Sequence, residues 1–535
     1  MNKSLLVGAV LGAVGVTAGG AVATYSLVKS GPEYAQVLAV EPVKTQIKTP
    51  REVCKDVTVT RQAPVKDQHQ IAGTAIGAVV GGLLGNQVGG GTGKKIATVA
   101  GAVGGGYAGF YTAFKLEKLL GKGEAEVTLV DPLPYLTYQP FLPEVVAGSI
   151  EARHVVTSHR RHLRNTNIVA GKVTNVDHKK KTATIEVAGL KPYKQQYDQI
   201  VVTAGAVSRT FPIPGVADNA IGLKTIEEAV EIRNRIMTNL DKAANLPAGA
   251  ARDRLLTFVV VGGGFAGIET FAEMRSLVSY LLRYYPSITF EDTHFHLIEA
   301  MGRIMPEVSL ETSQWVIANL DQRGAKIHLN TQLQSAVKGK IELSTGESFE
   351  SDVIVWTAGV MAHPFVRNTD LPLDERGRIT AKATLQVVEG EKIIADAWTA
   401  GDVSAVPDLT GGGVGGFCVP NAQHAVRQAK LLAKNIVASL RGEGIKEYYH
   451  VNLGAVAGLG IGVGVFQFRK LAIKGVIAWF MHRGYHGLAM PTWERKIRVV
   501  SGWFWNFILG RDLASLEAVR SPRLFFSTWA ARPGK

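Results

Sequence analysis

The sequence predicts an α/β fold built on two Rossmann-type βαβ units, with a glycine-rich N-terminal extension and an amphipathic C-terminal region. Two loops of the pattern Gly-x-Gly-x-x-Gly carry this prediction, one at 104–109 and one at 262–267. Each loop precedes a segment of helical spacing and then an apolar strand that ends on an acidic residue. Three other segments end in Thr-Ala-Gly, at 203–205, 357–359 and 399–401. We therefore expect nucleotide sites at the ends of these strands.

The composition limits the class of protein. The 535 residues suffice for three or more domains, 46% are hydrophobic and the net charge is +14. Basic residues lie beside aromatic and apolar ones near the C-terminus, which favours an anionic membrane over nucleic acid as a partner. The two cysteines, Cys54 and Cys418, form no CxxC pair, no metal-type cluster and no disulfide framework. We expect no metal site and no role for either cysteine.

The first 109 residues differ from the rest of the chain. An uncharged apolar run follows Lys3 and suits a signal peptide and a transmembrane anchor equally. After a polar stretch with several prolines, glycines recur at every fourth position, as in closely packed membrane helices: Gly73, Gly77, Gly81, Gly85, Gly89 and Gly93. This region resembles the glycine-zipper 2TM proteins of bacterial envelopes, which implies a structural role. A flexible glycine-rich linker is the alternative.

The first βαβ unit meets the zipper at Gly104, Gly106 and Gly109. Phe110–Leu120 has helical spacing, and the predicted strand Ala125–Val130 ends on Asp131, a candidate ribose ligand. In the alternative interpretation, glycines of this stretch continue the four-residue spacing of the zipper helix. The nucleotide interpretation requires residues 97–103 to form the first strand, although Gly and Ala are poor strand residues.

The second βαβ unit has a stronger strand. Leu256–Val261 is a buried-strand pattern that leads into Gly262, Gly264 and Gly267, and a helix is predicted after the loop. The next strand, His294–Ile298, ends on Glu299. No arginine stands next to Glu299 to receive a 2′-phosphate, so the acid favours NADH over NADPH.

Two βαβ units and three Thr-Ala-Gly ends outline a two-dinucleotide flavoprotein reductase. Beyond this outline, residues 104–535 resemble type II NADH dehydrogenase, the single-subunit NADH:quinone oxidoreductase of bacterial and mitochondrial membranes. The matching stretches are VTLVDPLPYLTYQPFLPEVVAGSIEARHVV, FVVVGGGFAGIETFAE, TAGDVSAVPD and PNAQHAVRQA. The resemblance implies FAD and NADH as cofactors and a quinone dissolved in the bilayer as the acceptor.

The resemblance also implies roles for individual residues. The FAD ligands would be Gly104, Gly106, Gly109, Asp131, Gln139, Pro140, Gly205, Gly401 and Asp402. The NADH ligands would be Gly262, Gly264, Gly267, Glu299 and Gly359. Glu269 would lie near nicotinamide and flavin, and the quinone slot would contain Ala422, Gln423, Ala425 and Gln428, with Glu269 and Gln423 as the catalytic pair. The alternatives are a first-turn helix acid for Glu269, a solvated position for Gln428 and a packing or surface position for His424.

Two C-terminal segments carry the membrane signal. In Lys470–Phe480 and Lys496–Leu509, basic residues accompany aromatic and aliphatic ones, as in a helix that lies in the membrane interface. An ordinary amphipathic core helix is the alternative. By the resemblance, the glycine-rich apolar segment Val451–Phe468 belongs to the catalytic body and does not span the membrane.

The resulting organisation places the catalytic part at the cytoplasmic face of the inner membrane. We expect an anchor or signal peptide at 1–26, a linker at 27–70, the zipper segment at 71–96, the FAD domain at 97–252 and 386–445, the NADH domain at 253–385 and the membrane-associating region at 446–535. Because NADH is cytoplasmic, the zipper segment supplies at most one return crossing. The oligomeric state stays open, with a homodimer as one alternative. The competing hypothesis is an envelope structural protein fused to an inactive or mis-joined reductase.

Overall fold

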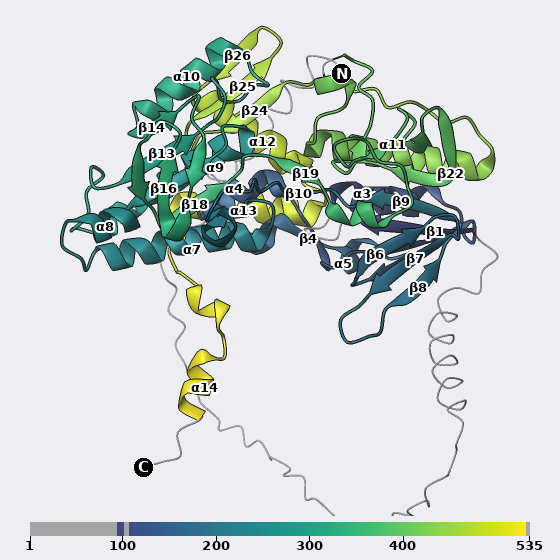
Figure 1. Cartoon of the computed structure of the whole chain (residues 1–535), viewed down its shortest axis with the longest axis horizontal. Helices are drawn as coiled ribbons and strands as arrows, with labels where there is room; N and C mark the ends of the chain where they lie inside the picture. Colours follow the sequence, from purple (N-terminus) through teal and green to yellow (C-terminus); the bar gives the residue numbers. More distant parts are fainter. Residues whose placement is uncertain (1–93, 101–105, 412, 531–535) are drawn as a thin grey trace, which may run out of the picture. The chain divides into compact units, whose positions relative to one another are not determined.

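Figure 1 shows the computed structural model, which describes residues 94–100, 106–411 and 413–530. All described residues belong to the compact unit Gly91–Lys535. The predictions for the signal peptide or anchor, the linker, the zipper glycines and Gly104 therefore lie outside the described residues.

The first large sheet has the strand order β21-β22-β9-β1-β2-β5. Its strands are parallel except for the edge strand β21, which runs antiparallel to β22. Helices α3 and α11 pack against each other beside this sheet (Figure 1). The bounds are β1 Lys94–Ala100, α3 Tyr107–Leu119, β2 Ala125–Val130, β5 Thr166–Val169, β9 Gln199–Thr203, β21 Gln386–Glu389, β22 Lys392–Thr399 and α11 Ala422–Arg441.

Strand β1 decides between the two interpretations of the junction. It pairs in parallel with β2, starting at Lys94 opposite Ala125, and with β9, starting at Ile96 opposite Gln199. The strand interpretation is confirmed, but the predicted bounds 97–103 are wrong by three residues, and the strand begins inside the predicted zipper segment. A strand paired on both sides is held by two ladders of backbone hydrogen bonds, so small residues with poor strand propensity are tolerated there.

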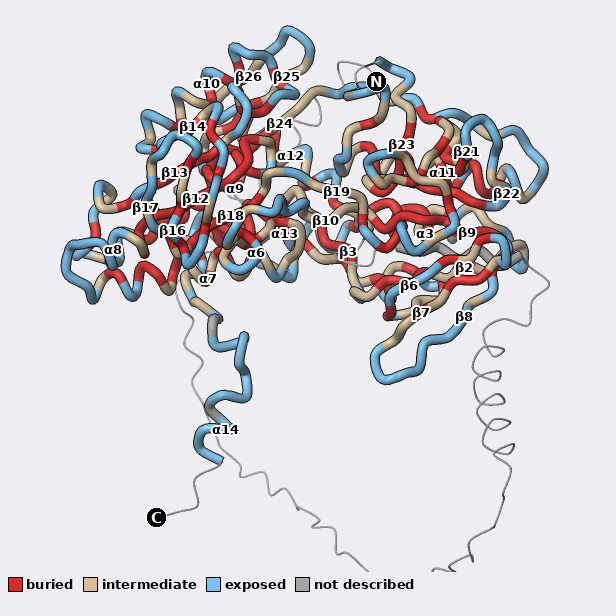
Figure 2. Tube along the Cα trace, viewed as in Figure 1, coloured by how far each residue is buried: buried red, intermediate tan, exposed pale blue. Residues whose placement is uncertain are grey.

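The second large sheet is parallel throughout, with the order β11-β18-β12-β13-β14. Phe258 of β12 stacks on Phe295 of β13 with the ring centroids 5.1 Å apart, and both side chains are buried. Figure 2 shows that β9, β12 and β18 are buried, as expected for parallel strands covered by helices. The bounds are β11 Ala220–Ile221, α7 Ile226–Ala243, β12 Thr257–Val261, α9 Phe265–Leu281, β13 His294–Ile298, α10 Leu310–Asp321, β14 Ala325–His328 and β18 Val353–Trp356.

Short helices and small sheets connect these parts. The pair β10–β19 is antiparallel, and β6–β7–β8 and β15–β16–β17 are antiparallel three-stranded sheets. The bounds are β3 Tyr135–Thr137, α4 Leu142–Val146, β4 Val156–Ser158, α5 His159–His162, β6 Lys172–Asp177, β7 Thr182–Glu186, β8 Tyr193–Gln196, β10 Ala206–Ser208, α6 Val216–Asn219, α8 Ala250–Leu255, β15 Leu333–Ser335, β16 Lys340–Leu343, β17 Ser348–Glu350, β19 Val360–Ala362, β20 Ile379–Thr380 and β23 Ser404–Ala405.

The C-terminal region begins with an antiparallel sheet of β24 Ala455–Gly458, β25 Gly464–Phe468 and β26 Leu471–Lys474. It continues with α12 Val476–Ala489, α13 Trp493–Leu509 and α14 Leu524–Ala530. Part of the segment Val451–Phe468 thus forms β24 and β25 of the folded body. Among the described residues, no helix has the length and apolarity needed to cross a bilayer.

Candidate functional site

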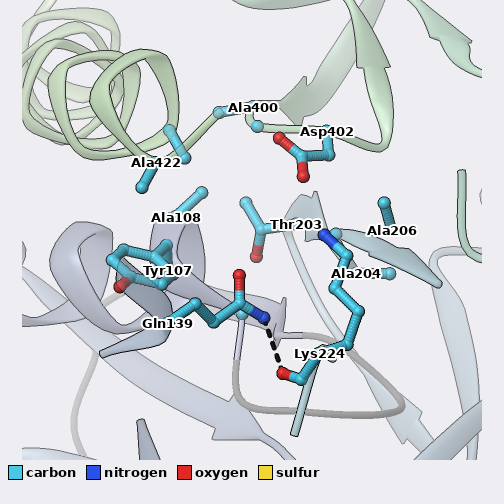
Figure 3. A pocket seen from close by; sticks show the side chains of 14 residues that line it. Tyr107, Ala108, Gln139, Thr203, Ala204, Ala206, Lys224, Ala400, Asp402 and Ala422 are labelled. Carbon is cyan, nitrogen blue, oxygen red and sulfur yellow. Dashed lines mark hydrogen bonds between the residues drawn. The ribbon is translucent and has the colours of Figure 1, made fainter. Parts of the chain in front are cut away.

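A pocket opens where the carboxyl ends of β9 and β22 meet the N-termini of α3 and α11 (Figure 3). The pocket is open to solvent on one side. Ligands of open α/β sheets bind at this end of the strands. The lining residues are Gly106, Tyr107, Ala108, Gln139, Thr203, Ala204, Gly205, Ala206, Lys224, Ala400, Gly401, Asp402, Ala422 and Ala425.

The pocket brings together many of the predicted FAD residues. Gly106, Gln139, Gly205, Gly401 and Asp402 line it, from four separate stretches of chain. Two further predicted residues, Gly109 in the buried first turn of α3 and Pro140 next to Gln139, lie beside the lining residues in the chain. The predicted quinone residues Ala422 and Ala425 line the same pocket from α11.

Two glycines give the pocket its backbone shape. Gly205 and Gly401 have φ of +70° and +80°, which strain any residue with a Cβ. A Cβ on Gly401 would lie 3.3 Å from the Cβ of Ala108 and 3.7 Å from that of Ala425. A Cβ on Gly205 would have no atom within 4 Å. Gly401 therefore permits close packing of the turn on α3 and α11, and Gly205 faces open space.

The polar groups of the pocket suit a phosphate-bearing ligand. The amide nitrogen Nε2 of Gln139 donates to the carbonyl of Lys224 at 3.0 Å, and the Lys224 side chain extends towards Asp402 (Figure 3). Burial raises the pKa of Asp402, and the charge of Lys224 opposes this shift. The helix N-termini at Tyr107 and Ala422 add the partial positive charge that attracts anions. The hydroxyl of Tyr107 is buried without a hydrogen-bond partner among the described residues, so a ligand could satisfy it.

Asp131 stands at the end of β2 as predicted, but it lies below the surface. Its side chain is 1% exposed, Oδ1 accepts a hydrogen bond from the Leu133 amide at 2.9 Å, and Oδ2 lies 3.2 Å from Nε2 of His159. Burial raises the pKa of Asp131, and the contact with His159 opposes the shift. Both oxygens are thus engaged within the protein, and the ribose role of Asp131 stays a prediction.

The second glycine loop has the geometry of a dinucleotide loop. Gly262 has φ of +112°, and a Cβ on it would lie 2.7 Å from the backbone of Thr357. A Cβ on Gly267 would lie 1.9 Å from the carbonyl oxygen of Gly262, so this position requires glycine for the packing of helix on loop. A Cβ on Gly264 would meet no atom within 4 Å, which leaves the start of α9 open to a pyrophosphate.

Glu299 closes the other side of this loop. Its Oε2 accepts a hydrogen bond from the Gly263 amide at 2.5 Å, and its Oε1 accepts one from the Met301 amide at 2.7 Å. The predicted ligand Gly359 follows β18, the strand next to β12, with φ of +131° and open space where a Cβ would stand. The loop, Glu299 and Gly359 therefore share the carboxyl edge of the second sheet.

Glu269 lies in the second turn of α9 and contacts the C-terminal region. Its Oε1 accepts a hydrogen bond from the Gly458 amide at 2.9 Å and lies 3.0 Å from Nε2 of His482. The side chain is 12% exposed, so Glu269 is more than a solvated acid in an early turn of a helix. Sequence reasoning missed His482, as it missed Lys224 in the pocket, because neither stands in a glycine loop or at a strand end.

Helix α11 places the predicted quinone residues differently. Gln428 is 2% exposed, and its Oε1 accepts a hydrogen bond from the Gly401 amide at 2.8 Å, so the alternative of a solvated position is wrong. Gln423 is half-buried and lies outside the pocket lining. His424 is buried with Nδ1 2.9 Å from the Tyr448 hydroxyl, and burial lowers its pKa to about 4, which confirms a packing histidine.

Cys418 has no disulfide partner among the described residues, and Cys54 lies outside them. The Cys418 thiol is buried, and its burial raises the pKa to about 11, so a reactive thiolate is disfavoured.

Comparison with known protein families gives two matches. The model of the pyridine nucleotide-disulphide oxidoreductase family matches residues 102–429, and the glycine zipper 2TM domain matches residues 72–112. The two matches overlap at the stretch 102–112, where strand β1 gives way to α3.

Similar curated proteins cover most of the chain. "Probable NADH dehydrogenase" of Dictyostelium discoideum is 26% identical over 75% of this chain and 89% of its own length. "Type II NADH:quinone oxidoreductase Ndh" of Mycobacterium tuberculosis is 26% identical over 74% of this chain and 85% of its own length. The solved structure of NDH2 from Plasmodium falciparum in complex with NADH superposes with a TM-score of 0.71 at 18% identity, over 79% of this chain and 99% of that one. The superposition shows a shared fold.

Proposed function

Because the chain belongs to the pyridine nucleotide-disulphide oxidoreductase family, we propose that it is a FAD-dependent NADH:quinone oxidoreductase of the type II class. The observation that carries the proposal is that a pocket lies at the carboxyl edge of the first large sheet and a glycine loop at that of the second. The similar proteins of Dictyostelium discoideum and Mycobacterium tuberculosis are named as NADH dehydrogenases. A disulfide reductase would need a pair of redox cysteines, whereas Cys418 stands without a partner among the described residues.

The pocket of the first sheet is proposed to hold FAD. Gly104, Gly106 and Gly109 would bind its pyrophosphate at the start of α3. Asp131 would bind its ribose once its side chain gives up the contacts with the Leu133 amide and His159. Lys224 and Asp402 would face the chain between the phosphates and the ring, with Gln139, Pro140, Gly205 and Gly401 around it. When bound there, the flavin would accept a hydride from NADH and pass the electrons to the quinone.

The second loop is proposed to hold NADH. Gly264 leaves room for the pyrophosphate, and the dipole of α9 favours its negative charge. The Glu299 carboxylate accepts hydrogen bonds from backbone amides, and it would accept them from the adenosine ribose in the same way. An acid at this position repels a 2′-phosphate, so NADH is preferred to NADPH. Gly359 would border the nicotinamide side of the site.

The quinone is proposed to reach the start of α11. Ala422, Gln423 and Ala425 would line its slot, and Gln428 would support the slot by holding the Gly401 amide. Gln423 would hydrogen-bond the quinone carbonyl. Glu269 would act at the meeting point of nicotinamide and flavin.

A membrane face is proposed on the C-terminal helices. Large apolar side chains of α12 and α13 are exposed, and basic residues accompany them on α13. Such a face suits a monotopic enzyme whose quinone is dissolved in lipid. The exposed side chains are Val476, Ile477, Phe480, Trp493, Ile497, Trp505, Phe507, Ile508 and Leu509. The proposal includes attachment to the cytoplasmic face of the inner membrane and at most one return crossing before β1. It leaves the oligomeric state open, with a homodimer as one alternative.

The test is to purify the full chain in detergent, record its visible spectrum and assay NADH oxidation with a short-chain quinone. We expect a bound-flavin spectrum and quinone-dependent NADH oxidation that exceeds NADPH oxidation. A protein without flavin would contradict the assignment of the first pocket. Equal rates with NADH and NADPH would contradict the role of Glu299. Digestion of sealed vesicles from their outer face alone would contradict the cytoplasmic orientation.

A further inference from the structure

A cluster of buried ionisable groups lies between α9 and the C-terminal helices, apart from the residues that bind cofactor in the proposal above. It consists of three carboxylates and three basic side chains, which we call the buried charge cluster: Glu144 of α4, Glu269 and Glu273 of α9, His482 and Arg483 of α12, and Arg511 after α13. Buried charges are costly unless they are paired, so a cluster of this size requires a structural or functional explanation.

One face of α9 organises the cluster. Glu269, Glu273, Ser276 and Tyr280 follow each other at spacings of three or four residues and therefore lie along one side of the helix. The C-terminal region covers this side. Gly458 and His482 contact Glu269, and Arg511 donates a hydrogen bond to Oγ of Ser276 at 2.8 Å. The polar stripe runs from the cofactor end of α9 into the protein.

Glu144 joins the cluster from the opposite side. Its Oε2 accepts a hydrogen bond from the Trp503 indole at 2.9 Å and lies 3.1 Å from Nη2 of Arg483. Its Oε1 lies 3.9 Å from Nδ1 of His482. His482 therefore stands between two carboxylates, with Glu269 at one ring nitrogen and Glu144 at the other.

The cluster holds polar atoms that its other members do not satisfy. His482 is 3% exposed and Glu273 is 2% exposed. Among the described residues, Nδ1 of His482 and Oε2 of Glu273 have no hydrogen-bond partner, whereas Nε2 of His482 lies 3.0 Å from Oε1 of Glu269. A buried group that only stabilised the fold would be expected to have its hydrogen bonds satisfied. A buried group that gains and loses a proton changes its hydrogen bonds, so it can have an unmet one in one protonation state.

A second histidine connects the cluster to the FAD pocket. His486 lies one turn after His482 on α12, with the ring centroids 4.6 Å apart. Its Nδ1 lies 3.0 Å from the hydroxyl of Tyr138. Tyr138 precedes the pocket residue Gln139, and its ring lies 6.1 Å from that of Tyr107, which lines the pocket. The rings of Tyr107, Tyr138, His486 and His482 therefore follow one another from the pocket to the carboxylates of Glu269 and Glu144.

The proposed reaction requires one proton that NADH does not supply. NADH gives up a hydride, which is two electrons and one proton, whereas a quinone takes two electrons and two protons to become a quinol. One proton per turnover must therefore come from the solvent through the protein. A protonated carboxyl or imidazolium would break its O–H or N–H bond as the quinol O–H bond forms, and water would then restore the proton.

We propose that His482 is the positioning residue of Glu269, and that His482 and Glu273 hold the solvent-derived proton of quinone reduction. The proposal rests on the proposed function. It assigns the C-terminal helices a role in the reaction in addition to membrane attachment, because α12 carries His482, Arg483 and His486.

The charges around Glu273 support this assignment. Burial and the charge of Glu144 raise the pKa of Glu273, while Arg511, Arg483 and His482 oppose the shift. The net result is a pKa of about 7. Arg323, after α10, also faces Glu273. Burial lowers the pKa of His482, but Glu269 and Glu144 outweigh it, so the net shift is upward. The pKa of Glu273 therefore lies near neutral pH, and that of His482 lies above its ordinary value.

The test compares two variants with a matched control over pH 6–8. Stopped-flow absorbance would measure flavin reduction by NADH and flavin reoxidation by quinone separately. In His482→Gln, reoxidation should be slower and its pH midpoint should lie higher, because the cation that lowers the pKa of Glu273 is gone. In Glu273→Gln, reoxidation at pH 7 should slow about tenfold or more and lose its pH dependence. Flavin reduction should change less than twofold in Glu273→Gln.

The control is His178→Gln. His178 is a buried histidine paired with the Tyr197 hydroxyl, and it lies on the small β6–β7–β8 side of the first domain. It should leave both half-reactions unchanged. If the wild-type midpoint persists in both cluster variants, or if His178→Gln shifts it equally, the proposal is wrong.

Infrared spectroscopy supplies a readout without turnover. A carboxylic-acid C=O band of the wild type should disappear between pH 6 and 8 and be absent in Glu273→Gln. A missing band would overturn the proposal even if His482→Gln fails to fold. A chain without flavin or NADH oxidation would refute the proposed function instead, and the infrared band would still report on Glu273.

Discussion

Glu273 should make the stability of the fold depend on pH. Its pKa is about 7 in the folded chain against 4.5 for a free side chain. The folded state therefore binds this proton more tightly than the unfolded state does, so the stability associated with it is complete below pH 4.5 and is lost as pH rises through 7. At 1.36 kcal/mol per pKa unit, the shift corresponds to a loss of about 3 kcal/mol above pH 7.

Replacing Glu273 by Gln keeps the shape and removes the titration. The free energy of unfolding of Glu273→Gln minus that of the wild type should be about 2.5 kcal/mol larger at pH 8 than at pH 5. Urea unfolding at both pH values, followed by tryptophan fluorescence and circular dichroism, measures this difference. The exposed Glu389→Gln serves as control and should change unfolding by about 0.5 kcal/mol or less. A difference between Glu273→Gln and wild type that does not vary with pH would refute the reasoning.

Three further predictions concern the nucleotide sites and the membrane face. Gly267→Ala should destabilise the fold by about 1–3 kcal/mol, because its Cβ would lie 1.9 Å from the carbonyl oxygen of Gly262. Gly264→Ala should preserve the melting temperature and raise the KM for NADH, because its Cβ would meet no protein atom within 4 Å. Equal melting temperatures of the two variants would contradict this. Gln428→Leu leaves the Gly401 amide without its acceptor and should lower the free energy of unfolding by about 1–3 kcal/mol. The variant should lose FAD more readily during dialysis, while its KM for NADH should not change. Phe507→Asp should weaken flotation with anionic vesicles roughly tenfold, since Phe507 is 90% exposed on α13, while the distant control Leu190→Asp should not. Equal flotation of both would argue against the membrane face.

Local patterns predicted most of the fold. The strands Ala125–Val130 and His294–Ile298 have the predicted bounds, and the acids after them stand at the predicted sheet edges. The type II NADH dehydrogenase resemblance is confirmed by the similar proteins. The first strand was misplaced by three residues, because its small side chains give no clear pattern and pairing with β2 and β9 sets its register.

The sequence by itself determined the two βαβ units, because glycine loops, helical spacing and strand-end acids are signals that lie within about 40 residues of each other. It also predicted NADH rather than NADPH as the cofactor, from the acidic residue Glu299. The tertiary structure alone decided what meets across the fold. Glu269 and Gly458 are 189 residues apart in the chain, and Tyr138 and His486 are 348 apart. No periodicity encodes such pairs, since their contact depends on how α9, α12 and the first sheet pack. The buried charge cluster and the Gln428–Gly401 hydrogen bond arise in this way.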